Sequence, residues 1–128
     1  MLKTKSVHTK IERSDGLRVL VARYRGRGLP ADRYDVWVAS LGPSEELLRS
    51  FLSERVSWSE FQRRYKAEMD APSEVDRKSK TIKNHGQKWT MRLLAHLANE
   101  GDFTLLCHCD EDERQCHRHI LASLIERA

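Results

Sequence analysis

The residues best suited to chemistry lie in one short stretch near the end of the chain. It contains all three cysteines, in the segments Cys107-His108-Cys109 and Cys116-His117-Arg118. A cysteine close to arginines and to a helix N-terminus has a lowered pKa, and the thiolate is the reactive form. We therefore predict thiol chemistry, with Cys107 or Cys116 as the nucleophile and His117 as its proton-transfer partner. The alternative is that small buried cysteines only pack in the core.

Three arginines are candidates for binding the negative charge of a ligand. Arg23 precedes a glycine-containing turn near the N-terminus, and Arg27 lies within that turn. Arg118 directly follows His117. A guanidinium group donates paired hydrogen bonds to phosphate and carboxylate groups. We predict that these three arginines bind an anionic small molecule, phosphate-like or a nucleotide, beside the thiols.

The same stretch also supplies the donor atoms of a metal site. Three sulfurs and one nitrogen, a set that zinc and iron accept, come from Cys107, Cys109, Cys116 and His117. Cys116 and His119 form a further pair at i, i+3. However, the Cys-x-Cys pair and the six-residue gap after it differ from the Cys-x2-Cys spacing of common structural zinc sites. Zinc or iron binding is therefore the alternative, and the thiolate hypothesis needs no cofactor.

The composition of one loop excludes a phosphatase signature. His108-Cys109 followed by Arg114 is similar to a His-Cys-x5-Arg phosphate loop, but only four residues intervene and all four are acidic. Such a loop binds phosphate through converging backbone N–H groups, and four carboxylates would repel that ligand. The acids are typical of a solvated loop before a helix N-terminus.

The charge distribution also indicates an anionic partner. The net charge is +4, and residues 1–33 hold nine Lys/Arg against three acids, while residues 77–92 hold six and no acid. Clustered bases attract phosphates, so a nucleic-acid-binding module that uses residues 18–33 and 78–92 is a further alternative. The remaining interpretation is an ordinary solvated surface.

Length and composition predict one domain in the cytoplasm. A chain of 128 residues with 39% apolar residues fits a single domain over residues 1–128. The basic start lacks the apolar stretch of a signal peptide, and no run reaches the roughly 20 apolar residues of a membrane span. An odd number of closely spaced cysteines is typical of free thiols in a reducing compartment. We therefore expect no membrane partner.

The pattern of apolar runs predicts an α/β fold with a mainly parallel sheet flanked by helices. Residues 17–24 and 103–107 are expected to be buried strands, and residues 35–39 a short extended segment. Ser44 and Ser57 are expected to cap two helices, the second reaching about residue 69, and a polar loop follows to about residue 84. Ligands collect at the carboxyl ends of parallel strands, which here are residues 23–27 and 107–109.

Two more helices are predicted in the second half of the chain. Asn84 and Gln87 have the spacing of a capping box, and Gly101 is expected to end that helix. Its apolar face is predicted to contain Trp89, Leu93, Leu94, Leu97 and Ala98. On the last helix the apolar face is Ile120, Leu121, Leu124 and Ile125. His117 falls at the centre of this face, with Cys116 and Arg118 beside it, whereas His119 points to solvent.

Several segments resemble a known family. They are Asp15-Gly16-Leu17-Arg18-Val19-Leu20-Val21, Leu41-Gly42-Pro43-Ser44-Glu45-Glu46-Leu47, Trp58-Ser59-Glu60-Phe61, and Leu105-Leu106-Cys107 with Cys116-His117-Arg118. The chain resembles the YeaO-like family, domain of unknown function 488, in the branch that carries Cys-His-Arg. The resemblance implies a small cytoplasmic α/β fold, and its matching site positions are Arg23, Arg27, Cys107, Cys116, His117 and Arg118. The chain departs from the family at three places: Ala22 replaces a usual aspartate, Arg25-Gly26 replaces a usual Trp-Pro pair before Arg27-Gly28, and Cys109 is an additional cysteine.

Overall fold

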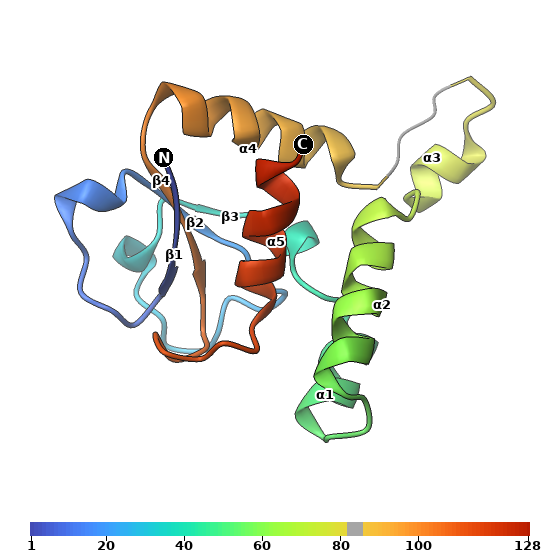
Figure 1. Ribbon diagram of the computed structural model, residues 1–128, viewed down its shortest axis with the longest axis horizontal. Helices are drawn as coiled ribbons and strands as arrows, with labels where there is room; N and C mark the ends of the chain where they lie inside the picture. Colours follow the sequence, from blue (N-terminus) through green and yellow to red (C-terminus); the bar gives the residue numbers. More distant parts are fainter. Residues whose placement is uncertain (82–85) are drawn as a thin grey trace.

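The protein is built on a parallel β-sheet. The computed structural model describes residues 1–81 and 86–128, and in these residues four strands pair in the order β1-β4-β2-β3, all parallel (Figure 1). The strands are β1 (Leu2–Ser6), β2 (Leu17–Leu20), β3 (Val36–Trp37) and β4 (Phe103–Cys107). The predicted α/β layered fold is confirmed.

The register brings three strand ends to the same edge of the sheet. Ser6 of β1 is paired with Cys107 of β4, and Leu20 of β2 with Leu106. The backbone of Val21 extends this pairing, because its N–H donates to the carbonyl of Leu106 at 2.9 Å. The segments that follow β1, β2 and β4 therefore meet beyond the carboxyl edge, which is where parallel sheets bind ligands.

Helices α1 (Glu45–Leu52), α2 (Trp58–Asp70), α4 (Lys88–Glu100) and α5 (His117–Glu126) pack together on one face of this sheet. The short helix α3 (Glu74–Lys78) lies beyond the end of α2, away from the sheet (Figure 1). Figure 1 shows α5 between the sheet and α2. The buried apolar residues of α1, α2, α4 and α5 all belong to one large cluster, which also contains Val19, Phe103 and Leu105 of the sheet. That cluster is the main core.

Successive residues of β4 face opposite sides of the sheet, as in any strand. Phe103 and Leu105 point into the main core, whereas Leu106 packs with Val7 and Leu29 in a smaller cluster that contains no residue of the helices described. The same alternation continues past the end of the strand. It places Cys107 on the helix-covered face and His108 on the other.

Two predicted helix starts agree with the structure. The hydroxyl of Ser44 accepts a hydrogen bond from the backbone N–H of Leu47, and that of Ser57 accepts from Glu60. Each satisfies one of the N–H groups that a helix leaves free at its start. The carboxylate of Glu60 does not complete a capping box with Ser57, because Arg63 and Arg64 bind it instead.

Other predicted elements need correction. β1 was not predicted, and α3 lies within residues predicted to form a loop, where Ser73 and Asp76 form a capping box. β2 ends at Leu20 rather than at residue 24. Asn84, the predicted cap of the next helix, lies outside the described residues, and α4 has Gln87 as its N-cap without a side-chain hydrogen bond.

The predicted buried face of α4 is also wrong in part. Met91 and Leu94 are its buried residues, with Ala95 and Ala98 packed against the core. Trp89 and Leu93 are 54% and 60% exposed. The Trp89 ring instead lies under the cations of Lys88 and Arg92, 5.3 and 5.8 Å from its centroid. In the described part of the chain, no helix is both long and apolar enough to cross a membrane.

A buried ion pair fastens the turn before β2 to β1. Asp15 lies 2.9 Å from the ammonium of Lys5, and their side chains are 6% and 15% exposed. Burial alone would raise the pKa of Asp15, but the backbone N–H of Glu12 and the Lys5 ammonium outweigh it and hold this pKa below its ordinary value. The carboxylate is therefore the form that the fold stabilises.

Replacing Asp15 with asparagine is expected to lower the free energy of unfolding at pH 7 by about 2 kcal/mol, because a hydrogen-bonded charge is lost. Since the folded-state pKa is depressed, the contribution is complete above the ordinary value near 3.8 and disappears as the pH falls through the folded-state pKa. Urea unfolding from pH 7 down to pH 3 measures this. Asp112→Asn, in an exposed loop, is the control, and a difference that stays constant over this range would contradict the assignment.

Candidate functional site

Two cysteines and one histidine meet at the carboxyl edge of the sheet. Cys107 ends β4, Cys116 is the N-cap residue of α5, and His117 is its first residue. Their sulfur and ring nitrogen atoms all lie within 4.8 Å of one another. The exposed fractions of these three residues are 5%, 2% and 6%, so the group is shielded from solvent.

The orientation of His117 is set by one backbone contact. Its Nε2 lies 2.8 Å from the carbonyl oxygen of Val21, which can only accept, so Nε2 carries the proton and donates. Nδ1 then presents its lone pair 3.8 Å from the Cys107 sulfur. Burial lowers the pKa of His117, which keeps the ring neutral, and Tyr65 packs edge-on against it with ring centroids 5.6 Å apart.

Cys109 adds a third sulfur to the group. Its Sγ lies 3.9 Å from that of Cys107, and the residue is half-buried. Contact with the Cys109 and Cys116 thiols, together with the Arg118 charge, holds the pKa of Cys107 well below its usual range. Contact with Cys107 in turn raises the pKa of Cys109 and of Cys116. Because neighbouring thiolates repel one another, the charged form is favoured at Cys107 and disfavoured at Cys109 and Cys116.

Two of the three predicted anion-binding arginines donate to backbone carbonyls. Arg118 is completely buried, and its terminal nitrogens bind the carbonyls of Cys109, Asp110 and Glu111 at 3.2, 2.8 and 3.2 Å. Arg23 binds the carbonyls of residues 42 and 43, both at 2.8 Å. Both guanidinium groups hold loops in place, and Arg118 positions the segment that carries Cys109.

Arg27 is in a different environment. It is exposed, and among the described residues it forms no hydrogen bond or ion pair. It borders a hollow of about 330 Å³ on the side of the sheet opposite the thiols. The residues around this hollow are His8, Gly26, Arg27, Gly28, Leu29, Pro30 and His108. The imidazole rings of His8 and His108 lie 5.8 Å apart.

The structure thus gathers part of the predicted site and disperses the rest. It brings Cys107, Cys116 and His117 within 4.8 Å of one another, and Cys109 joins them through its contact with Cys107. The pair Cys116 and His119 does not form a second site, because the His119 ring bonds to the carbonyl of Glu113. His8 and His108 were not predicted. The only signal for His8 would have been its position just after a strand, and the strand at residues 2–6 was not predicted.

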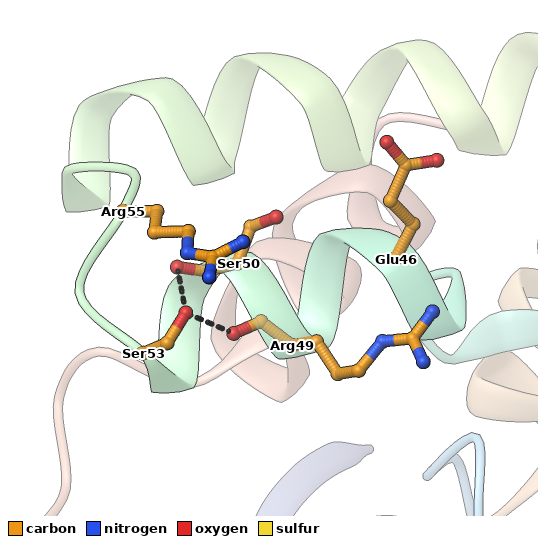
Figure 2. A pocket seen from close by; sticks show the side chains of 5 residues that line it. All are labelled: Glu46, Arg49, Ser50, Ser53 and Arg55. Atoms are coloured by element: carbon orange, nitrogen blue, oxygen red, sulfur yellow. Dashed lines mark hydrogen bonds between the residues drawn. The ribbon is translucent and has the colours of Figure 1, made fainter.

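A second hollow, of about 450 Å³, is bordered by none of the thiols. Figure 2 shows the residues that line it, on α1 and the turn after it: Glu46, Arg49, Ser50, Ser53 and Arg55. The Ser53 hydroxyl donates to the carbonyl of Arg49 at 2.7 Å. None of the predicted site residues borders this hollow, and the carboxylate of Glu46 offsets the positive charge of Arg49 and Arg55.

Comparison with known proteins identifies the family of this chain. Residues 2–128 match a family model, DUF488-N3a, that is described as the active DUF488-N3 subclade. The chain belongs to the DUF488-N3a family. The Escherichia coli (strain K12) protein named "Uncharacterized protein YeaO" is 30% identical to this DUF488-N3a chain over 100 residues, covering 77% of this chain and 84% of YeaO. The predicted resemblance to YeaO-like proteins is confirmed, and no solved structure gives a significant match.

Proposed function

We propose that this DUF488-N3a protein binds a zinc ion through Cys107, Cys109, Cys116 and His117. The observation that carries the proposal is the convergence of buried sulfur and nitrogen donors from β4 and the start of α5. Soft thiolate ligands combined with an imidazole favour zinc or iron over magnesium or calcium. Iron is the other metal that this ligand set accepts.

The distances between the donor atoms support tetrahedral coordination. Ligands at about 2.3 Å for sulfur and about 2.0 Å for nitrogen from a tetrahedral zinc are about 3.6–3.8 Å from one another. The Cys107 sulfur is 3.9 Å from the Cys109 sulfur and 3.8 Å from Nδ1 of His117. These two separations fit a zinc ion beside Cys107. Cys109 is not part of the group whose donor atoms all lie within 4.8 Å of one another, so its side chain would have to move closer to Cys116 or His117.

The surroundings of His117 support the same proposal. A metal-binding histidine almost always donates its other ring N–H to a carboxylate or a backbone carbonyl. His117 does so with the carbonyl of Val21, which leaves Nδ1 directed at the sulfurs. Arg118 supports the segment of Cys109 in turn.

A second candidate function is thiol chemistry without a metal. The thiol–imidazole pair of Cys107 and His117, 3.8 Å apart, favours it, because such a pair activates cysteine nucleophiles. In this case Cys107 would give its proton to His117 and form a bond to an electrophilic centre of an anionic substrate, and the leaving group would depart with the proton from His117. The predicted set of three arginines does not support this candidate, because Arg23 and Arg118 donate to backbone carbonyls and Arg27 lies on the opposite side of the sheet. Burial of Cys107 weighs against this candidate.

Elemental analysis of protein purified without chelator tests the two candidates together. We expect one equivalent of zinc per chain and thiols that react slowly until a chelator removes the metal. Protein that stays metal-free after incubation with zinc, and that has one fast-reacting thiol at neutral pH, would contradict the metal centre. That result would favour the Cys107 nucleophile.

A further inference from the structure

The hollow around Arg27 is built at the edge of the sheet where ligands bind. His8 lies just past β1, the turn 26–28 lies past β2, and His108 lies just past β4. Three consecutive strands of the sheet order therefore contribute to it. This is the arrangement that parallel sheets use to collect a ligand at their carboxyl ends.

The arginines in and around this hollow differ in whether their guanidinium groups already have hydrogen-bond partners. Arg25 binds the Tyr34 hydroxyl and the carbonyl of Leu29, both at 2.6 Å. Arg33 binds the carbonyls of residues 7 and 9. These two arginines hold the walls in place and add positive potential. The guanidinium of Arg27 remains available to a ligand.

The two imidazoles complete the polar lining. Nε2 of His108 lies 3.0 Å from the carbonyl oxygen of Tyr24 and donates to it, which fixes the ring and leaves Nδ1 for other contacts. The His8 ring, 5.8 Å away, is exposed. None of the residues that border the hollow is acidic, in contrast to the hollow of Figure 2, which contains Glu46.

The turn between the imidazoles and Arg27 depends on glycine. Gly26 and Gly28 have φ angles of 90° and 74°, a region that favours glycine. A Cβ on Gly26 would lie 2.8 Å from Cε1 of His108, so a side chain there would displace the ring. The glycine turn is therefore part of what places His108 in the hollow.

We propose that this hollow binds the phosphate group of a small molecule. Arg27 would be the main phosphate-binding residue, and His8 and His108 would be further hydrogen-bonding partners. A guanidinium gives paired, charge-assisted hydrogen bonds to phosphate. The hollow of about 330 Å³ accommodates such a group with a small organic part. The proposal goes beyond the metal centre and does not depend on it, because none of the zinc ligands borders the hollow.

Inorganic phosphate is the first probe. It is titrated into the protein as purified, and binding is monitored through the NMR signals of the histidine imidazoles. We expect saturable shifts of the His8 and His108 signals, with the His119 signals unchanged. Arg27→Gln is expected to weaken phosphate binding by about tenfold or more, the loss of one charge-assisted pair of hydrogen bonds. Arg27 is exposed, so this variant is expected to fold normally.

Arg55→Gln is the matched control, since it removes the same charge from the hollow of Figure 2. Equal weakening by both variants would show a general charge effect and would overturn the proposal. Shifts at His119 instead of His8 and His108 would overturn it as well. So would tight binding of a single-stranded oligonucleotide to which Arg27→Gln makes no difference, because the anion would then lie on another surface.

Discussion

Replacing Cys116 with serine is expected to lower the zinc affinity of this protein by at least about 100-fold. Loss of an outer-shell partner already costs about 10–100-fold in metal affinity, and a serine hydroxyl in this position replaces a direct thiolate ligand. Cys116 is 2% exposed and within 4.8 Å of two other donors, so its loss leaves only two members of this buried group. Competition with a chromophoric chelator measures the affinity.

Two further variants calibrate this result. Cys109→Ser is expected to cost less, because Cys109 is half-buried and the group of Cys107, Cys116 and His117 remains intact. His119→Ala removes a neighbouring imidazole that bonds to Glu113 instead, and we expect unchanged affinity. Equal zinc affinity in the Cys116→Ser and unsubstituted proteins would remove the metal centre from consideration.

The same variants are expected to differ in how much zinc raises their thermal stability. A ligand that binds only the folded state stabilises it by about 2.7 kcal/mol at a free concentration 100 times its Kd. We therefore expect zinc to raise the Tm of the unsubstituted protein and of His119→Ala, and to leave the Tm of Cys116→Ser nearly unchanged. Substituting cobalt for zinc gives an independent readout, since tetrahedral thiolate coordination of cobalt absorbs in the visible range.

Replacing Arg118 with methionine is expected to lower the free energy of unfolding by about 3 kcal/mol. Three backbone carbonyls, of residues 109, 110 and 111, lose their donor, and each group left without a partner costs about 1–3 kcal/mol where water cannot replace it. Among the residues that the structure describes, the Nε of Arg118 has no partner, which offsets part of the loss. Urea unfolding at neutral pH measures the change.

The control for Arg118 is Arg114→Met, in the same segment but exposed, which we expect to change stability by less than about 0.5 kcal/mol. Arg118→Lys keeps the charge and is expected to fall between the two. Because the lost hydrogen bonds hold the backbone of Cys109, zinc affinity should decline in Arg118→Met as well. A methionine variant as stable as the unsubstituted protein would mean that water replaces the guanidinium.

The sequence is informative where a pattern repeats or a cap is local. β4 is observed at 103–107 as predicted, because an uninterrupted apolar run fits a strand buried on both faces. His117 is buried as the 100° spacing of α5 requires. β1, in contrast, has the residues Leu-Lys-Thr-Lys-Ser, and its place in the sheet comes from backbone pairing with β4, which leaves no apolar signature.

The roles of the arginines could not be read from the sequence for a related reason. Arg23 and Arg118 bind carbonyl groups of segments brought close by the fold, and a carbonyl acceptor is the same at every residue. Cys-x-Cys spacing was equally uninformative about a metal site. The thiols converge because β4 and α5 meet at one edge, and this is a tertiary arrangement.

The alternation along β4 has a consequence for how this protein can diverge. Cys107 faces the helices and His108 faces the opposite layer, so adjacent residues belong to the thiol group and to the hollow separately. Substitutions on one side need not be compensated on the other. Relatives that lack Cys109 could therefore keep the imidazole hollow, and relatives that lose the hollow could keep the thiols. A single-residue insertion or deletion there would exchange the two sides and abolish both sites at once.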